Sequence, residues 1–218
     1  MPDLSPAPMP PSLDLGIFGG TFDPPHIGHM IIAQAACDAL GLDQVLFVPA
    51  ADPPHKQGIS LTPSDQRWAM LDQAITDNPR FVLSDIDMAR PGPHYTVDML
   101  RIVKDRYPKR ELYFVLGSDA LRDFATWRDP GGIIAQARLA VVVRPGANVD
   151  LASLDAKVPG LAARSVFVDA PEIDISGTLL REWLRTNHSI RYLVPDTVEQ
   201  YIAKNALYRN SDHVQEPS

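Results

Sequence analysis

The amino-acid sequence predicts an α/β protein with an open, doubly wound and mostly parallel sheet. Short runs typical of β-strands alternate with helical patterns along the chain. Two of these runs, 111–117 and 137–143, are almost continuously apolar, which is typical of strands covered by helices on both faces. The length of 218 residues suffices for one such domain with a substantial core. Together these observations favour a parallel sheet between two layers of helices.

The elements follow one another in strand–helix alternation. Strands are expected at 13–18, 44–49, 81–86, 111–117, 137–143 and 165–170. Helices are expected at 28–41, 63–76, 95–107, 176–186 and 195–205. The last two helices follow the last strand, which predicts a small helical part at the C-terminal end. Four large side chains on predicted helices are interpreted as core: Trp68, Met70, Met99 and Trp183.

Both ends of the chain are expected to lie outside a single domain that spans residues 13–208. Residues 1–12 contain five prolines, too many for a helix or an inner strand, and are interpreted as a flexible tail. Residues 209–218 are polar and are expected to be disordered.

Composition and charge exclude several classes of function. The single cysteine, Cys37, cannot form an internal disulfide, which excludes a secreted disulfide scaffold and fits a reducing compartment. The first residues lack the basic and apolar regions of a signal peptide, and no apolar run approaches the ~20 residues of a membrane span. We therefore expect a cytoplasmic protein with no membrane partner. The net charge of −7 argues against a long nucleic acid as partner.

The segment after the first predicted strand is the strongest candidate for a ligand site, because parallel sheets bind ligands at the carboxyl ends of their strands. It reads GGTFDPPHIGH over residues 19–29. Two glycines let the backbone approach a ligand closely, and the N–H groups of a helix start there favour an anion. His26 and His29 are three residues apart, so both rings can face one phosphate. The alternatives are a turn with surface histidines or, less favoured without a nearby cysteine, a zinc site.

With this segment the chain resembles the nucleotidyltransferase superfamily that carries an H-x-G-H motif, and within it the bacterial nicotinate-nucleotide adenylyltransferases. P-loop and G-x-G-x-x-G sequences are absent. The resemblance covers roughly residues 13–208 and rests on segments in the same order: 19–29, 53–56, 94–100, 117–121 with 126–127, 144–146, 175–181 and 190–208. It implies a Rossmann-like nucleotidyltransferase fold, ATP and nicotinate mononucleotide as substrates, and a role in NAD biosynthesis.

The resemblance also implies a site assembled from several strand exits and helix starts. Four side chains are expected to act on the phosphates: His26, His29, Lys56 and Arg181. Thirteen further residues are expected to contact the substrates: Gly19, Gly20, Thr21, Phe22, His55, Thr96, Gly117, Asp119, Trp127, Arg128, Arg144, Ser176 and Thr178. No residue is expected to be dedicated to a metal ion. Mg²⁺ is expected to accompany ATP, bound mainly by phosphates and water.

Two groups have reasons in the residues themselves. Ser176 and Thr178 open a predicted helix, where hydroxyls and N–H groups can bind the β- and γ-phosphates. Trp127 offers a flat face for a pyridine ring, and Thr96 begins a helix whose amides suit the carboxylate of nicotinate. The alternatives are an ordinary capped helix and a tryptophan buried as packing. Gly177 departs from the Ser-Ser-Thr that the family often has, and phosphate binding is expected to survive this departure.

The other assigned side chains have structural alternatives as well. Asp119 follows a buried strand and is expected to bind ribose hydroxyls or to hold a cationic side chain, but it could instead cap the next helix. Arg128 is expected to assist at the acceptor. For His55, Lys56 and Arg144 the alternative is an ordinary surface charge.

The implied reaction is attack by the phosphate of nicotinate mononucleotide on the α-phosphorus of ATP, with release of pyrophosphate. That phosphate is ionised near neutral pH, so positioning and charge stabilisation are expected to suffice. One alternative is a related transferase that acts on phosphopantetheine or glycerol phosphate. A second is a fragment of a tRNA ligase, because residues 26–29 spell HIGH, and a third is a nucleotide sensor without activity. The acidic balance and the lack of a K-M-S-K-S sequence disfavour the ligase. The sequence is compatible with a homo-oligomer but does not specify one.

Overall fold

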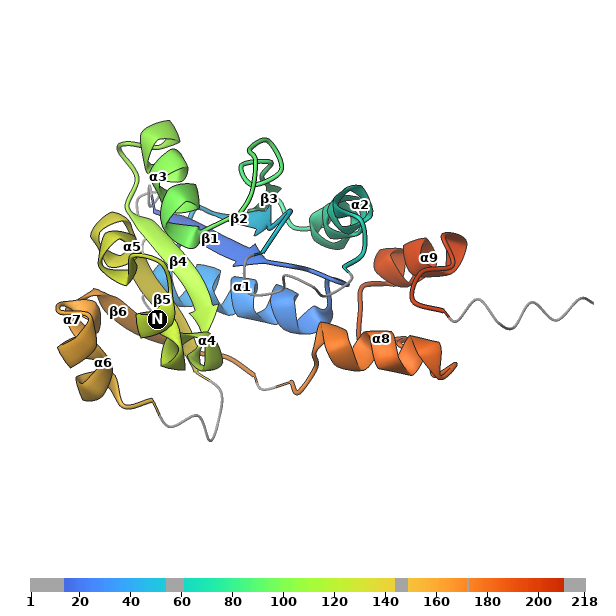
Figure 1. Cartoon of the computed structure of the whole chain (residues 1–218). Helices are drawn as coiled ribbons and strands as arrows, with labels where there is room; N and C mark the ends of the chain where they lie inside the picture. The colour runs from blue at the N-terminus through green and yellow to red at the C-terminus, as the bar shows by residue number, and fades with distance from the viewer. Residues whose placement is uncertain (1–13, 54–60, 144–148, 172, 210–218) are drawn as a thin grey trace, which may run out of the picture.

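The computed structural model describes residues 14–53, 61–143, 149–171 and 173–209 (Figure 1). Its centre is a six-stranded sheet in the order β3-β2-β1-β4-β5-β6, and every neighbouring pair of strands is parallel. The strands are β1 Leu15–Gly20, β2 Gln44–Pro49, β3 Phe81–Leu83, β4 Leu112–Gly117, β5 Arg138–Val143 and β6 Ser165–Asp169. The predicted doubly wound α/β fold is confirmed, with a sheet that is parallel throughout.

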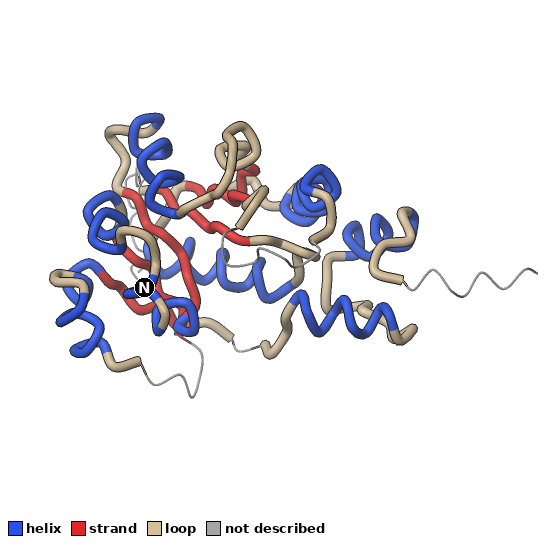
Figure 2. The backbone as a smooth tube through the Cα atoms, in the orientation of Figure 1, coloured by secondary structure: helices blue, strands red, loops and turns tan. Residues whose placement is uncertain are grey.

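Helices cover both faces of this sheet (Figures 1 and 2). The longer ones are α1 Ile27–Leu40, α2 Ser64–Ile75, α3 Thr96–Arg106, α8 Gly177–Arg185 and α9 Asp196–Lys204. The shorter ones are α4 Ser118–Arg122, the 3-10 helix η2 Phe124–Thr126, α5 Pro130–Gln136, α6 Leu151–Lys157 and α7 Leu161–Arg164. As predicted, α1 ends at Gly41, whose φ of 62° lies in the left-handed region that glycine adopts without strain.

Alternate side chains of each strand divide the core into two layers, because successive residues of a strand point to opposite faces. Ile17 and Phe114 belong to the cluster that α3 and α5 cover, whereas Phe18 and Val115 belong to the cluster that α1 and α2 cover. A third cluster joins α8 and α9 to Met70 of α2. The predicted helical part at the C-terminal end is thus packed against α2, beside the sheet (Figure 1).

The sheet opens at its switch point, where the chain returns from β3 to lie on the other side of β1. The pairing between β1 and β4 runs only from Leu15 and Leu112 to Ile17 and Phe114. The last residues of both strands therefore part from one another. A crevice between the carboxyl ends of β1 and β4 is the usual place for a ligand in such folds.

The structure differs from the sequence-based expectation in three details. The predicted strand at 81–86 is confined to Phe81–Leu83, the outer strand. The connections from β4 to β6 contain the short helices α4, η2, α5, α6 and α7, which were not expected because elements this short show no helical periodicity. Trp183 is wrongly interpreted as core: it is 36% exposed, because the apolar stripe of α8 runs through Leu180 and Leu184 instead.

Candidate active site

A cavity of about 670 Å³ opens between the carboxyl ends of β1 and β4. Six of the predicted substrate-binding residues line it: Gly19, Gly20, Thr21, Thr96, Trp127 and Arg128. These residues come from the exit of β1, the start of α3 and the segment after η2, and the fold brings them together at the switch point.

The two histidines of the motif lie beside the exit of β1 and their rings are stacked, with centroids 3.7 Å apart and planes 28° from parallel. His26 is the N-cap of α1, and its backbone N–H donates to Nδ1 of His29 over 3.1 Å. A ring nitrogen that accepts from an amide carries no proton, so the proton of a neutral His29 is on Nε2. This imidazole is therefore oriented as a hydrogen-bond donor through Nε2.

The start of α1 offers fewer amides than the predicted anion site, because three of its N–H groups, those of His26, Ile27 and His29, are already used. His26 N–H donates to His29, Ile27 N–H donates to the carbonyl of Leu193 over 3.0 Å, and His29 N–H donates to the carbonyl of His26 over 2.9 Å. A ligand here would meet imidazole rings rather than a row of amides. Gly28 leaves room for the His26 ring, since a Cβ at position 28 would lie 3.1 Å from Nδ1 of His26.

The assignment of Phe22 to the substrate needs correction as far as its side chain is concerned. The ring is 2% exposed and packs against Phe18, Phe47 and, at 4.9 Å between centroids, His29. Its φ of 49° is a left-handed conformation that side chains rarely adopt. Phe22 therefore supports the His29 ring from within the core and does not present its side chain to the cavity.

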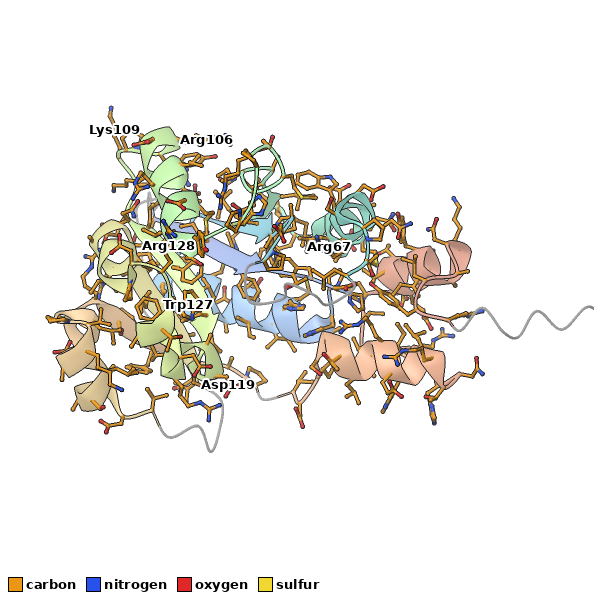
Figure 3. All side chains as sticks on the ribbon, in the orientation of Figure 1. Arg67, Arg106, Lys109, Asp119, Trp127 and Arg128 are labelled. Carbon is orange, nitrogen blue, oxygen red and sulfur yellow. The ribbon has the colours of Figure 1, made fainter. Side chains whose placement is uncertain are left out.

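Arg67 of α2 does not line the cavity but supports its walls from within the core, and it was not assigned to the site from the sequence (Figure 3). It is 1% exposed, and its guanidinium donates to four backbone carbonyls at 2.8–3.1 Å: those of Thr21, Ala50, Ala51 and Thr62. Burial lowers the pKa of this guanidinium, opposed by the charge of Asp23. Arg67 thereby ties the exit of β1 to the exit of β2. The sequence does hint at its burial, because Arg67 precedes Met70 by three residues and Leu71 by four and so lies on the apolar face of a helix.

The end of the cavity beside α3 and η2 combines an aromatic face with positive charge. Trp127 packs against Phe114 and Phe124, at 6.0 and 5.3 Å between ring centroids, and also lines the cavity. Packing and ligand contact, which the sequence presented as alternatives, are thus compatible. Arg128 lies over the ring of Tyr95, 4.6 Å from its centroid. Thr96 is the first residue of α3, where N–H groups have no acceptor within the helix.

Asp87 and His94, also missed by the sequence, complete this end. Asp87 lines the cavity at 5% exposure and accepts from Nε and a terminal nitrogen of Arg90 at 2.9 and 2.8 Å. Burial raises the pKa of the Asp87 carboxyl, and Arg90 opposes this shift. His94 accepts from the N–H of Asp52 at Nδ1 over 2.9 Å, and its Nε2 lies 3.1 Å from the carbonyl of Arg90. His94 therefore joins the loop after β2 to the loop before α3.

Gly117 and Asp119 lie at the exit of β4 but do not line this cavity. Gly117 is the N-cap of α4, and a Cβ added there would meet open space. Asp119 forms an ion pair with Arg122 in its own helix and is not the cap. Of the alternatives, holding a cationic side chain is thus realised, and contact with a ribose stays a prediction.

The start of α8 brings the predicted phosphate-binding residues to the exit of β1. Ser176 caps the helix by accepting from the N–H of Leu179 over 3.2 Å, as predicted. Arg181 donates to the carbonyl of Asp23 over 2.6 Å and contacts Thr178 Oγ1 at 3.4 Å. Gly177 has a structural reason, since a Cβ there would lie 2.6 Å from the Asp23 carbonyl oxygen.

Three predicted site residues, His55, Lys56 and Arg144, lie outside the described residues. Within the part of the chain that is described, no three His, Cys, Asp or Glu side chains are grouped so as to hold a metal ion. Across the same ranges, none of the helices has the length and apolar character needed to cross a membrane.

Comparison with solved structures supports the fold. The structure of the nicotinic acid mononucleotide adenylyltransferase of Plasmodium falciparum complexed with NaAD superposes with a TM-score of 0.75 over 89% of this chain and 97% of that one, at 22% identity. The same enzyme complexed with APC gives a TM-score of 0.71, with coverage of 89% and 96%.

Comparison with known sequences identifies the family. A model of the cytidylyltransferase-like family matches residues 17–183. A protein of Thermomicrobium roseum named "Probable nicotinate-nucleotide adenylyltransferase" is 47% identical over 195 residues, which cover 89% of this chain and 91% of the relative. A protein of the same name from Thermus thermophilus is 44% identical and is covered over 99% of its length. The chain therefore belongs to the nicotinate-nucleotide adenylyltransferases, within the cytidylyltransferase-like family of nucleotidyltransferases.

Proposed function

We propose that this enzyme transfers the adenylyl group of ATP to nicotinate mononucleotide, giving nicotinate adenine dinucleotide and pyrophosphate. The observation that carries this proposal is that one and the same cavity is lined by Trp127, Arg128 and Thr96 at one end and by Gly19–Thr21 at the other. Its acceptor end suits a flat ring with a negative carboxylate. Its other end is formed by the exit of β1, and the same segment continues through Asp23, which accepts from Arg181, to the stacked histidines.

Each end of nicotinate mononucleotide has a counterpart in the cavity. The pyridine ring stacks on the free face of Trp127. The carboxylate lies near the start of α3 and the Arg128 guanidinium, both of which favour negative charge. Nicotinamide, which has a neutral amide in place of the carboxylate, would gain less from either group. We therefore infer a preference for the nicotinate compound.

The chemical step is a direct displacement at the α-phosphorus of ATP. An oxygen of the acceptor phosphate forms the new P–O bond, and the bond to the bridging oxygen breaks, so that its electron pair leaves with pyrophosphate. His29 donates a hydrogen bond from Nε2 to the transferring phosphate. The ring of His26 is stacked on the ring of His29. Arg181, whose side chain reaches back from the second turn of α8 to Thr178 in the first, stabilises the charge that develops on pyrophosphate.

No general base or covalent intermediate is needed in this scheme. The attacking phosphate is already ionised, and Cys37, the only cysteine of the chain, is fully buried in α1. Positioning and electrostatic stabilisation therefore account for the step. Mg²⁺ enters with ATP as part of the substrate, held by phosphate oxygens and water, since Mg²⁺ keeps several waters and uses few protein ligands.

The test is pyrophosphate release with ATP and Mg²⁺, measured in parallel with nicotinate mononucleotide, nicotinamide mononucleotide and phosphopantetheine. The expected result is turnover with nicotinate mononucleotide, weaker turnover with the nicotinamide compound and none with phosphopantetheine. A higher kcat/KM with phosphopantetheine would refute the acceptor assignment. Absence of turnover with all three would refute the proposed reaction.

A further inference from the structure

Asp23, in the middle of the GGTFDPPHIGH segment, is a point where three distant parts of the chain meet. Its side chain is 4% exposed. One carboxylate oxygen accepts from the hydroxyl of Tyr208 over 2.6 Å, and the other accepts from the N–H of Thr62 over 3.2 Å. Its backbone carbonyl accepts from Arg181 over 2.6 Å. Asp23 is therefore bonded to the segment before α2, to α8 and to the residues that follow α9.

The two helix starts that face the phosphates in the proposed function meet at this residue. Asp23 lies three positions before His26, the N-cap of α1. The start of α8 approaches from the other side so closely that only glycine fits at position 177, where a Cβ would lie 2.6 Å from the Asp23 carbonyl oxygen. A displacement of Asp23 would therefore move the histidine pair relative to Arg181.

Tyr208 reaches this point from the last described residues of the chain, after the end of α9. Its backbone φ of 64° is left-handed, a conformation that is unfavourable for a residue with a side chain. Such conformations persist where surrounding contacts determine them. Its ring belongs to the apolar cluster of α8 and α9, and its hydroxyl also lies 4.0 Å from Sδ of Met70. The hydroxyl thus belongs to the C-terminal helical part and donates to Asp23 in the GGTFDPPHIGH segment.

We propose that Tyr208 is a positioning residue for adenylyl transfer, which acts through Asp23 to fix His26 and His29 relative to the start of α8. This inference rests on the proposed function and adds a role for the C-terminal end of the chain. Burial, together with the Asp23 carboxylate, raises the pKa of Tyr208, so the hydroxyl remains a proton donor over the whole neutral and moderately alkaline range. Over that range the hydroxyl therefore keeps donating to Asp23.

The substitution Tyr208→Phe tests the proposal, because it removes the hydroxyl and keeps the ring in its apolar cluster. The variant loses a hydrogen bond to a carboxylate, and such bonds are stronger than those between neutral groups. Without this bond the two histidines are held less firmly, and kcat should fall about ten- to hundredfold. The KM for nicotinate mononucleotide should stay within about twofold of wild type, since Trp127 and Thr96 are untouched. A residue that is merely structural would change the melting temperature but not kcat at a temperature where the variant is folded.

The matched control is Tyr192→Phe, which removes a hydroxyl from a side chain that is 75% exposed in the same C-terminal part. It should keep wild-type kcat. In an Asp23→Ala background, Tyr208→Phe should lower kcat by much less than it does alone, because the carboxylate that accepts from the hydroxyl is already absent.

Circular dichroism establishes that each variant is folded at the assay temperature. A Tyr208→Phe enzyme that is folded and retains wild-type kcat would overturn the positioning role. So would full additivity of the two substitutions. Because wild-type turnover is measured in the same series, failure of the proposed function would appear as an inactive wild type, which is distinct from either outcome.

Discussion

Replacing Trp127 by leucine tests the acceptor end of the cavity. The indole ring packs on one side against Phe114 and Phe124, with ring centroids 6.0 and 5.3 Å away, and lines the cavity on the other. Leucine retains apolar contact with the two phenylalanines, so the fold should tolerate it. What the variant loses is the flat face on which a pyridine ring can stack.

The magnitude follows from how much of the indole is available. Stacking of a base on an aromatic side chain contributes about 1–3 kcal/mol. Since part of the indole is already covered by Phe114 and Phe124, the lower part of this range applies, about 1.4 kcal/mol, which corresponds to about tenfold in affinity. The KM for nicotinate mononucleotide should therefore rise about tenfold in Trp127→Leu. The KM for ATP should stay close to wild type.

The assay is steady-state pyrophosphate release, with each substrate varied at saturating concentration of the other. Trp183→Leu is the matched control, because it makes the same change at a tryptophan that is 36% exposed on α8 and outside the cavity. If Trp127→Leu and Trp183→Leu show the same KM for nicotinate mononucleotide, the ring does not stack on Trp127 and the orientation of the acceptor is wrong.

Three further predictions concern the phosphate end and the core. His29→Ala should lower kcat about 10²–10³-fold with the fold intact, as for loss of a donor to developing charge, and near-wild-type turnover would exclude the assigned role. Arg67→Lys should lower the free energy of unfolding in urea by about 2–4 kcal/mol, because an ammonium cannot reach all four carbonyls and leaves buried ones unsatisfied; a change below about 0.5 kcal/mol would contradict this. Burial raises the pKa of the Cys37 thiol from 9.0 to about 11. At pH 8 the folded protein therefore holds about a hundredfold less thiolate at this position than a free cysteine would. The stability that the neutral buried thiol contributes is lost only as the pH rises from about 9 towards 11. Native protein at pH 8 should therefore resist a thiol reagent that labels it fully in denaturant, and rapid labelling of the native state would show that Cys37 is accessible.

The fold could be predicted from the sequence because its main elements carry local patterns. The buried strands β4 and β5 are apolar throughout, and their neighbours alternate with helices long enough to show a period. The helices α4 to α7 were missed because elements of four to seven residues carry no such period. The exposed position of Trp183 was missed because the direction in which α8 packs is decided by its contacts with α9 and α2.

The candidate site could be predicted where its residues belong to local motifs, and not where they depend on tertiary contacts. Thr96, Trp127 and Arg128 do line one cavity, as expected from their segments. The use of the first amides of α1 could not be foreseen, since one of their acceptors, Leu193, is far away in the sequence. The bond between Asp23 and Tyr208, 185 positions apart, has no signature in spacing or composition.

Direct transfer is tested with ATP that carries a radioactive α-phosphorus, incubated with Mg²⁺, nicotinate mononucleotide and the purified wild-type enzyme. The label should move into a single product that contains both nicotinate and adenine, in a one-to-one ratio with pyrophosphate, and no label should remain on the protein. Label that stays in ATP, appears in AMP or is trapped on the protein would contradict direct adenylyl transfer to nicotinate mononucleotide.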